Sequence, residues 1–568
     1  MRTINIKERV KKRKANKIPY FLAIIISLIS TTIFLLVTEK TLAISAAKHI
    51  SRVGNREVVY PIYRIYLDNL GEYYASSIQE NLLEVQFEEK NRFSIVNDEK
   101  KADIYFTFIN EGNQVYQNYL LPVGHFYWIK DSVSTEEIEN GDYNIYLKKE
   151  TYDKNKTFLE LKYPDLTIES KDDLNSALED ESCNCIALVE EEELSKDNKL
   201  LKVDNKYYLD TFDAGIPIKI SVNTDDEDIN LDFVTNIIIK NIDLQNSTLN
   251  KDNIAKVNMT GVTALARRVA EAMATRNNYD YPAEKIGTFL SDADLTHTSN
   301  EISFVPGCTT YSGLRFCSRP ESIEALKAIG VDVIELTGNH NNDFGSQYNT
   351  QTIDKYKEEG IGYFGGGLNS EDAAKPYITE IDGTTIGFLG YNYYDAIVAN
   401  GTNALAGSNK AGANPYSESK MKSDIEDLKE RVDVVIVDFQ FQECYSYPSG
   451  DVIYPVCYKP INNQSSTFRK AIHYGANIVV GTQAHQPQTY ELYENGVIFY
   501  GLGNLFFDQS MWIGTRQGMI LTHYFNKGKL IQTKITPTIY DSSLQVEVAN
   551  QDDAKLLLEL LDTARESL

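Results

Sequence analysis

The sequence predicts an α/β protein in which two domains follow a single transmembrane helix. Three observations lead to this prediction: a length of 568 residues, one long uncharged apolar stretch near the N-terminus, and a repeated alternation of strand-like and amphipathic segments in the remainder. Because one hydrophobic core rarely serves a chain of this length, we expect a mixed α/β domain followed by a layered α/β domain.

The N-terminal segment combines a basic tail with an apolar stretch. Residues 1–17 contain eight Lys or Arg and one Glu, and the stretch from Tyr20 to Val37 has no charged residue and is long enough to cross a bilayer. Basic flanks stay in the cytoplasm, which places everything after about Glu39 outside. We therefore predict a cytoplasmic tail over 1–17, a single-pass anchor in the cell membrane over 18–38, and extracytoplasmic domains. A cleaved signal peptide is the alternative, because "LAISAA" offers small residues.

The charge of the extracytoplasmic part limits its partners. The chain has a net charge of −25 and residues 1–17 contribute +7, so the remainder carries −32. A basic groove for nucleic acid is therefore not expected. A polyanionic ligand would have to be met locally or through cations.

The six cysteines all lie in the predicted extracytoplasmic part, where disulfides form readily. Cys308 with Cys317 and Cys444 with Cys457 would each close a short polar loop, among fifteen possible connectivities. The two cysteines of "SCNC" are a weak metal-binding signal without a second ligand pair, so we expect structural or free thiols there.

A polar, turn-rich stretch, "NSTLNKDN", divides the extracytoplasmic part into two domains. Over 45–245, strand-like pieces such as "KADIYFTFI" and "CIALVEE" alternate with amphipathic pieces, which indicates the mixed α/β domain. Over 255–541 the alternation is more regular, and Gly330 and Gly360 are typical of left-handed caps at helix C-termini. Residues 542–568 are expected to be a C-terminal tail with a helix.

Polar side chains follow the predicted strands of the second domain at the point where each strand ends. Ligands collect at this edge of open α/β sheets, and five consecutive segments deliver Asn, His, Gln and Glu there, which indicates one shared site. Asp508 either lines this pocket or caps a neighbouring group. The candidate site residues are Asn300, Glu301, Asn339, His340, Gln440, Glu443, Gln483, His485 and Asn504.

Several of these segments resemble those of a known family. "ELTGNHNNDFG", "GTQAHQPQTYEL" and "GVIFYGLGNLFFD" are similar to signature segments of the bacterial capsule-synthesis CapA/PgsA family, which is associated with poly-γ-glutamate capsules and whose fold is similar to that of calcineurin-like metallophosphoesterases. "VNMTGVTALAR", "ADLTHTSNEISF" and "YFGGG" resemble a subgroup with an extra N-terminal domain. The resemblance implies a membrane-anchored cell-envelope protein that acts in production, handling or export of a surface polymer such as poly-γ-glutamate. Its partners would be that polymer or its precursor and other capsule-synthesis membrane proteins.

The resemblance also implies roles for four residues of the site. Asn339 would bind a metal and His340 would protonate the leaving group. Glu301 stands where the family places a carboxylate between two metals. His485 matches the second histidine of a His-x-His segment.

Three positions depart from the family's metal-binding pattern. Val262 stands in place of an aspartate, and Gln440 and Gln483 stand in place of histidines. Val has no donor atom, and a neutral Gln amide is a poor ligand at a two-metal centre. We therefore expect no pair of metals, and at most one divalent cation held by Glu301, Asn339 and His485.

Three functional hypotheses follow for this chain. The first is a binding or accessory protein with a degenerate phosphoesterase-like, amide-rich site. The alternatives are an active metal-dependent hydrolase or transferase with His340 as the catalytic general acid, and a solute-binding or sensing protein that acts through 45–245, which resembles part of a periplasmic solute-binding protein. His297 and His473 lie outside the matched segments, so we expect surface or packing roles for them.

Overall fold

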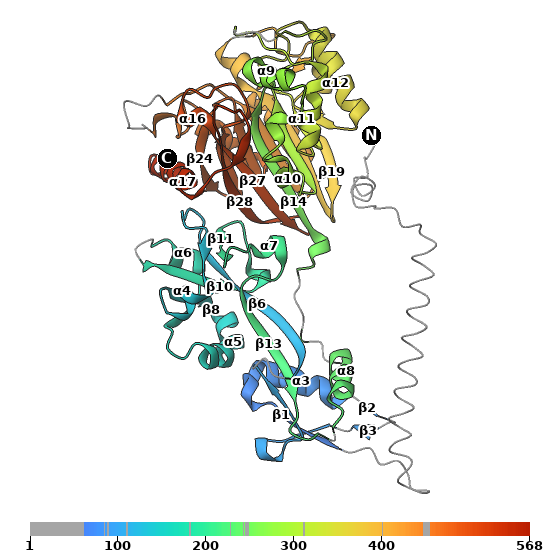
Figure 1. The fold of residues 1–568 in the computed structure, drawn as a ribbon, viewed down its shortest axis with the longest axis vertical. Helices are drawn as coiled ribbons and strands as arrows, with labels where there is room; N and C mark the ends of the chain where they lie inside the picture. Colours follow the sequence, from blue (N-terminus) through green and yellow to red (C-terminus); the bar gives the residue numbers. More distant parts are fainter. Residues whose placement is uncertain are drawn as a thin grey trace.

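The computed structural model describes two α/β domains, one above the other (Figure 1). The predicted tail over 1–17 and transmembrane anchor over 18–38 lie outside the described residues. No helix within the described part has the length and apolar character needed to cross a membrane. The described residues are 62–568 apart from 85, 88–89, 92, 109–111, 181–182, 228, 242–243, 245–248, 310–312, 400 and 447–454.

The first domain has two lobes that share strand β6. One half of its sheet has the order β4-β1-β5-β13-β6 and the other the order β6-β10-β8-β9, with β11 also paired to β6. The strands are β1 (Tyr63–Tyr66), β4 (Phe93–Ile95), β5 (Ile104–Thr107), β6 (Asn113–His125), β8 (Asn144–Lys148), β9 (Ile168–Lys171), β10 (Cys185–Val189), β11 (Asn198–Leu200) and β13 (Ile216–Asn223), with the short pairs β2 (Gln86–Phe87) and β3 (Lys90–Asn91), and β7 (Ser132–Val133) and β12 (Lys202–Val203). The antiparallel pair of β6 and β13 runs from one lobe toward the other (Figure 1).

A polar cluster is buried between the two lobes, where helix α3 meets helix α5. The Tyr74 hydroxyl donates to Asn155 Oδ1 at 2.8 Å, and Asn155 Nδ2 donates to Glu190 Oε1 at 3.1 Å. Lys154 Nζ donates to the other oxygen of Glu190 at 2.8 Å. We call these four residues the interlobe cluster. The helices of this domain are α3 (Gly71–Glu84), α4 (Thr135–Glu139), α5 (Lys149–Lys162), α6 (Leu174–Leu178), α7 (Tyr208–Thr211) and α8 (Leu231–Asn241).

The second domain contains two facing β-sheets. The first has the order β17-β16-β15-β14-β27-β28-β29, with β26 paired to β14, and the second has the order β19-β20-β22-β23-β25-β24. The strands of the first are β14 (Ile254–Thr263), β15 (Leu295–Asn300), β16 (Val333–Glu335), β17 (Gly362–Phe364), β26 (Asn504–Phe506), β27 (Gln517–Asn526), β28 (Lys529–Tyr540) and β29 (Val546–Val548). Those of the second are β19 (Tyr377–Ile381), β20 (Thr384–Asn392), β22 (Val434–Gln440), β23 (Ile478–Thr482), β24 (Pro487–Tyr493) and β25 (Gly496–Leu502), and a separate short pair consists of β18 (Gly366–Gly367) and β21 (Gly412–Ala413).

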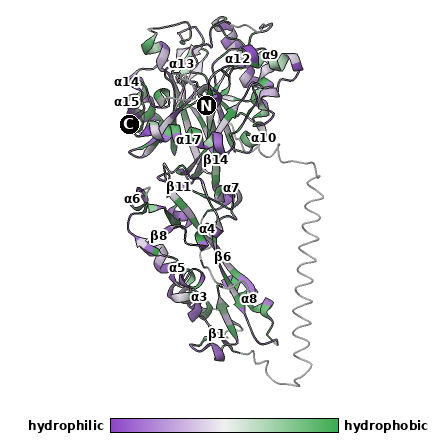
Figure 2. Ribbon diagram, turned by 60° about the vertical axis from the view of Figure 1, so that its left-hand side comes forward, coloured by the Kyte–Doolittle hydropathy of each residue, from purple (hydrophilic) through white to green (hydrophobic). Residues whose placement is uncertain are grey.

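Apolar side chains from both sheets form one core, and helices cover the outer faces. Val333 of the first sheet and Ile436 of the second are fully buried in this core. Helix α14 shows why the helices pack: it buries Met421, Ile425 and Leu428, which share one face. Figure 2 shows hydrophobic and hydrophilic residues mixed along the covering helices. The helices are α9 (Arg267–Arg276), α10 (Gly287–Leu290), α11 (Ile323–Ala328), α12 (Ser346–Glu359), α13 (Ser370–Ala373), α14 (Glu418–Lys429), α15 (Gln464–Tyr474), α16 (Ile513–Arg516) and α17 (Gln551–Arg565).

The segment 542–568, expected as a tail with a helix, contributes to this domain. Strand β29 pairs with β28, and helix α17 buries Leu557 and Leu561 in the core shared by the sheets. The hydroxyl of Thr489 in β24 donates to the Leu561 carbonyl at 2.8 Å. The C-terminal helix is therefore an integral layer of the second domain.

The carboxyl ends of the parallel strands meet at one edge of the two sheets. Strands β14, β15 and β16 run parallel in the first sheet, as do β20, β22 and β23 in the second. Asn392, the last residue of β20, donates a hydrogen bond across to the carbonyl of Thr337, just after β16, at 2.8 Å. The sheet edge predicted to hold the site is therefore formed by both sheets.

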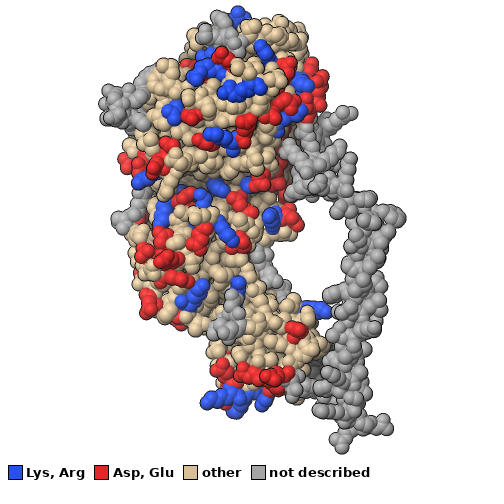
Figure 3. Space-filling view, in the orientation of Figure 1, with Lys and Arg blue, Asp and Glu red and all other residues tan. Residues whose placement is uncertain are grey.

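The two domains are joined by hydrogen bonds and an ion-pair network. The amide of Gln532 in β28 donates to the carbonyl oxygens of Ser195 at 2.7 Å and Asn198 at 3.0 Å, and it accepts from the Leu200 N–H at 2.9 Å. Lys534 Nζ of the second domain donates to Asp210 Oδ2 of the first at 2.8 Å, and Lys256 Nζ lies 3.0 Å from the other oxygen. Burial alone would raise the pKa of Asp210, but these two lysines lower it to about 2. Acidic side chains are dense over the visible face of the first domain (Figure 3).

Three disulfides use all six cysteines. The two bonds predicted to close short loops are present, at sequence separations of 9 and 13 residues. The two cysteines of "SCNC" were expected to be structural or free, and they are bonded to each other, which leaves the structural role. The bonds join Cys308 to Cys317, Cys444 to Cys457, and Cys183 to Cys185.

Candidate functional site

Three predicted strand-end residues form one network of amide groups. The side-chain amide of Gln440 lies 3.0 Å from the amide oxygen of Asn339 and 2.8 Å from that of Gln483. Strand β22 ends at Gln440 and pairs in parallel with β23, which ends directly before Gln483, so the sheet brings these side chains together. Gln440 and Gln483 are buried. We call these three residues the amide floor.

Glu301 adds a buried carboxyl group beside the amide floor. It follows the last residue of β15 and is 1% exposed. Neither side-chain oxygen makes a hydrogen bond of regular geometry within the described residues. Burial raises the pKa of Glu301 to about 8, although the nearby charge of His340 opposes the rise. Most Glu301 side chains therefore carry a proton at neutral pH, and apart from an irregular contact with Gln440 the carboxyl group has no hydrogen-bond partner among the described residues.

His340 faces the pocket with an acidic partner behind it. Its Nδ1 lies 2.8 Å from Asp343 Oδ2, and its ring packs edge-on against Phe316 with centroids 4.3 Å apart. Burial alone would lower the pKa of His340, but the Asp343 hydrogen bond and the carboxyl groups of Glu301 and Glu443 outweigh it and raise the pKa above its usual value. The protonated imidazolium is therefore favoured.

His485 has the opposite protonation preference. Its Nδ1 lies 2.9 Å from Asn504 Oδ1, and its ring lies 4.6 Å from that of Phe507. Burial lowers the pKa of His485 to about 4, so the ring is neutral at physiological pH. Its backbone is left-handed, with φ at 58°, as is that of Gln483 at 81°. Non-glycine residues held in this region are concentrated at functional sites.

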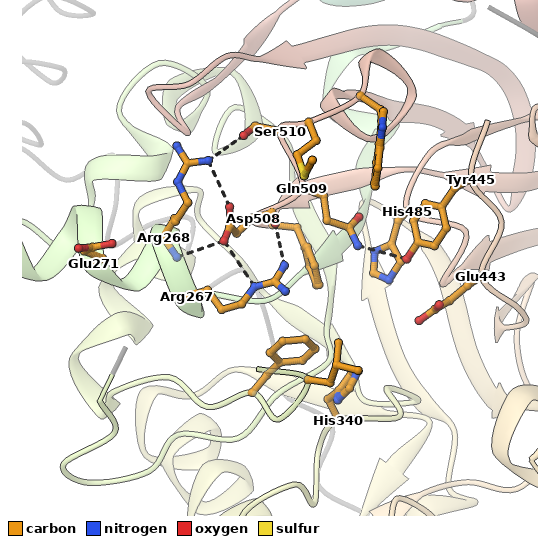
Figure 4. A pocket seen from close by; sticks show the side chains of 15 residues that line it. Arg267, Arg268, Glu271, His340, Glu443, Tyr445, His485, Asp508, Gln509 and Ser510 are labelled. Atoms are coloured by element: carbon orange, nitrogen blue, oxygen red, sulfur yellow. Dashed lines mark hydrogen bonds and ion pairs between the residues drawn. The ribbon is translucent and has the colours of Figure 1, made fainter. Parts of the chain in front are cut away.

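A pocket of about 720 Å³ opens above these residues (Figure 4). Three predicted residues line the pocket directly: His340, Glu443 and His485. The amide floor, Glu301 and Asn504 are not among its lining residues. Asp508 lines the pocket as well, and its carboxylate lies 3.4 Å from Arg267 Nε. The lining residues are Arg267, Arg268, Glu271, Leu314, Phe316, His340, Glu443, Tyr445, His485, Phe507, Asp508, Gln509, Ser510, Met511 and Trp512.

Asn300 is the predicted site residue that the structure uses elsewhere. Its Nδ2 donates to the Ile302 carbonyl at 2.9 Å and to the Tyr356 hydroxyl of α12 at 2.5 Å. Both of its amide hydrogens are therefore used in the fold, and Asn300 does not line the pocket. His297 is a packing residue, fully buried with Nε2 2.9 Å from an oxygen of Asp438, and His473 is a surface residue with a side chain 67% exposed.

The sequence prediction missed the arginine and aromatic residues of the pocket. Arg267 begins helix α9 directly after the strand-end segment "GVTALA", so the same strand-end reasoning could have included it. Phe316 and Tyr445 lie in loops beside the bonded cysteines Cys317 and Cys444, and no periodic pattern marks them. Their placement follows from the folded loops.

The residues present do not fit the two-metal centre that the family resemblance implies. Val262, in place of the expected aspartate, is buried and has no donor atom. Gln440 and Gln483 supply neutral amides that already contact one another. In the part of the chain that the structure describes, no three His, Cys, Asp or Glu side chains are grouped so as to hold a metal ion. The charge that two neighbouring cations require is therefore not supplied by this donor set.

Residues 256–509 match the family described as "Bacterial capsule synthesis protein PGA_cap". The chain is 26% identical over 321 residues to the capsule biosynthesis protein CapA of Bacillus anthracis, which covers 55% of this chain and 74% of that protein. It is 27% identical over 218 residues to the PGA biosynthesis protein CapA of Bacillus subtilis, covering 38% of this chain and 53% of that protein.

Two solved structures give weaker likenesses. The calcineurin-like phosphoesterase YfkN of Bacillus subtilis aligns with a TM-score of 0.31 at 10% identity, covering 55% of this chain and 99% of that chain. A phosphate transport receptor of Vibrio cholerae aligns with a TM-score of 0.23 at 10% identity, covering 31% of this chain and 93% of that chain. At these TM-scores neither superposition defines a shared fold. The matching family model and the CapA relatives support the resemblance of residues 256–509 to the bacterial capsule synthesis protein family.

Proposed function

We propose that the second domain acts in production, handling or export of a surface polymer by binding a segment of the polymer or of its precursor in the pocket. The observation that supports this is Glu301, a buried carboxyl group left without a regular hydrogen bond beside the amide floor. Amides and a protonated carboxyl group both donate and accept hydrogen bonds in fixed directions. They suit a peptide-like or saccharide ligand, and the curated relatives are named for capsule and PGA biosynthesis.

The proposal is tested by calorimetric binding of a defined γ-linked glutamate oligomer to the purified full chain and to Glu301→Ala. Loss of the Glu301 carboxyl group is expected to weaken binding about tenfold, since it removes a buried hydrogen-bonding group beside the amide floor, beneath the pocket lining. The exposed Glu430→Gln variant, which lies outside the pocket lining, is the matched control. Metal analysis of the same samples is the second arm, and two transition-metal ions per chain would contradict a binding role built on amides.

A second candidate function is hydrolysis or group transfer with His340 as the general acid. The specific observation in its favour is the 2.8 Å contact between His340 and Asp343, which favours the protonated ring at the pocket surface. A protonated His340 beside a neutral His485 is an arrangement suited to acid catalysis. Turnover of an oligomeric substrate that disappears in His340→Ala would establish this function in place of simple binding.

We further propose that the chain is held in the cell membrane by a single-pass helix over 18–38, with its domains outside the cytoplasm. The support is the uncharged stretch of the sequence and the positive charge of residues 1–17. Other capsule-synthesis membrane proteins are the proposed neighbours of the anchor. Membrane fractionation of the full chain and of a chain lacking residues 1–38 tests the anchor, and equal recovery of both in the soluble fraction would contradict it.

A further inference from the structure

The mouth of the pocket carries the two most exposed large apolar side chains of the described residues. Leu314 is 82% exposed and Met511 is 80% exposed, whereas every other large apolar side chain in the described part is at most 59% exposed. Both line the pocket together with the half-buried Trp512. We call Leu314, Met511 and Trp512 the apolar mouth. Single exposed apolar side chains are ordinary, but several gathered at one cavity mark a surface that contacts a ligand.

The two loops that carry the apolar mouth are each held to the rest of the domain. In the first loop, Arg315 Nε donates to the Asp343 carbonyl at 3.1 Å. In the second, Gln509 Nε2 donates to the Tyr445 hydroxyl at 3.2 Å. Because contacts within the domain fix both loops, the apolar side chains are presented outward by the fold.

Two arginines lie directly beside the apolar mouth. Arg268 Nη1 donates to the Ser510 hydroxyl at 2.9 Å, and Ser510 immediately precedes Met511. Half of the Arg268 side chain is exposed. The guanidinium of Arg267 is packed against Phe316, 4.9 Å from the ring centre, so its orientation is fixed before a ligand arrives. We call Arg267 and Arg268 the arginine pair.

The acidic groups around the arginine pair leave it able to bind an anion. Asp508 lies 3.4 Å from Arg267 Nε and 3.6 Å from Arg268 Nη1, so one carboxylate faces two guanidinium groups. Glu443 lies across the pocket from the pair (Figure 4), and burial raises its pKa, which favours the neutral form. Glu271, one turn further along α9, is exposed to solvent, where its charge is screened. A guanidinium binds the oxygens of an anionic group through paired hydrogen bonds.

We propose that the pocket binds an amphiphile whose anionic head group lies on the arginine pair and whose apolar chain lies over the apolar mouth. The pocket, of about 720 Å³, has its charged side and its apolar side next to each other. A lipid with an anionic head group contacts both sides at once, whereas a free anion or a polar oligomer would leave the apolar mouth uncovered. A tryptophan between an apolar and a charged surface is typical of residues that contact lipid. Neither Glu301 nor the amide floor contributes to this site, so it goes beyond the proposed function.

The test follows the fluorescence of Trp512 in the full chain, held in neutral phosphatidylcholine bicelles. The sequence has two tryptophans, so Trp128→Phe leaves Trp512 as the single reporter at the mouth. Three probes are used below their micelle concentrations. Decyl phosphate has an anionic head and a chain, decyl maltoside has the same chain and a neutral head, and inorganic phosphate has no chain. Partition of a probe into the bicelles is equal for every variant and cancels in the comparison.

Decyl phosphate should shift the Trp512 emission to shorter wavelength and saturate, with at least tenfold higher affinity than decyl maltoside. Inorganic phosphate should cause no shift. Arg268→Gln should weaken decyl phosphate binding about tenfold and leave decyl maltoside unchanged, because only the phosphate head pairs with the guanidinium. Leu314→Ser and Met511→Ser should each weaken decyl phosphate binding about fivefold, because each removes apolar contact with the chain.

Two surface variants outside the pocket are the matched controls. Ile397→Ser removes an apolar side chain that is half exposed, and Arg431→Gln removes an exposed charge. Neither should change the binding of any probe.

Three results would overturn the inference. Equal binding of decyl phosphate and decyl maltoside, unaffected by Arg268→Gln, would show that the arginine pair holds no head group. A shift with inorganic phosphate at the same affinity as decyl phosphate, unchanged in Met511→Ser, would show an anion site without an apolar part. No saturable shift with decyl phosphate would exclude an amphiphile at this pocket.

Calorimetry of the same samples with the γ-linked glutamate oligomer separates this site from the proposed function. Binding of the oligomer without binding of decyl phosphate would overturn the amphiphile site and leave the proposed function intact. Binding of decyl phosphate without binding of the oligomer is the outcome that supports the amphiphile site and removes only the proposed function.

Discussion

The interlobe cluster of the first domain and the buried Glu301 of the second differ in how completely their polar atoms are hydrogen-bonded. In the interlobe cluster of the first domain, Tyr74, Asn155 and Lys154 all direct hydrogen bonds within the cluster, and both oxygens of Glu190 accept one. In the second domain, Glu301 is more deeply buried, yet neither of its oxygens makes a regular hydrogen bond within the described residues.

This difference distinguishes buried polar residues that stabilise the fold from those that are available to bind a ligand. A cluster whose donors and acceptors match each other stabilises the arrangement of two lobes and has little left to offer a ligand. A buried group without a regular hydrogen bond costs free energy that the fold alone does not return, so Glu301 is a candidate to contact a ligand. Four experiments test this difference.

The largest effect is expected from the pH dependence of stability caused by Glu301. Its folded pKa of about 8 lies above the ordinary value of 4.5, so its contribution is fully present below about pH 4.5 and is lost as pH rises through 8. The loss is on the order of 4 kcal/mol in the free energy of unfolding. Chemical denaturation of the full chain between pH 5 and 9 should show it, and Glu301→Gln should flatten the curve.

Burial raises the pKa of Glu335 to about 7, so Glu335 also makes the free energy of unfolding fall as pH rises. Glu335 is present in both the unaltered chain and Glu301→Gln, so the difference between their two pH profiles reports Glu301. The exposed Glu271→Gln variant should reproduce the unaltered curve. Identical pH profiles for the unaltered chain and Glu301→Gln would show that Glu301 is paired after all.

A somewhat smaller effect is expected when the interlobe cluster loses its cation. Lys154→Met leaves the buried Glu190 carboxylate without its 2.8 Å partner, which should lower the free energy of unfolding by about 3 kcal/mol. Lys149→Met, at the exposed start of the same helix, is the control and should change stability by less than about 0.5 kcal/mol. Equal stability of both variants would mean that the cluster does not depend on complete pairing.

The contact between the domains should give an intermediate effect. Gln532→Ala removes four hydrogen bonds to the first domain and takes a donor from the Ser195 and Asn198 carbonyls, at a cost of about 2 kcal/mol. Limited proteolysis between the two domains should become faster, while Lys529→Ala at the exposed start of β28 should leave it unchanged. Unchanged cleavage in Gln532→Ala would argue that other contacts hold the domains together.

The smallest effect concerns the acid behind His340. Asp343→Asn removes the carboxylate at 2.8 Å that favours the imidazolium, so the pKa of His340 should fall. Titration of the ring by nuclear magnetic resonance measures this, with the exposed ring of His473 as the internal reference. A His340 pKa that does not move would assign its elevation to Glu301 and Glu443 alone.

The parts of the site that were predictable are those fixed by sheet geometry. Parallel strands bring their carboxyl ends to one edge, so the meeting of Asn339, Gln440 and Gln483 follows from the strand pattern alone. The direction of a strand-end side chain was not predictable: Asn300 is bound by Tyr356, which comes from a helix 56 residues later. The position of Arg267 after a strand end was predictable, but the orientation of its guanidinium was not, because it packs against two aromatic rings from distant loops.

Two disulfides cross-link the loops that carry aromatic residues of the pocket rim. The bond between Cys308 and Cys317 closes the loop that carries Phe316, and the bond between Cys444 and Cys457 begins directly before Tyr445. None of these cysteines lies in a strand of the two sheets, so oxidation cross-links the rim and leaves the layers beneath it unchanged. A chain whose four cysteines are reduced would keep the sheets that hold the amide floor but would lack both covalent links at the rim of the pocket.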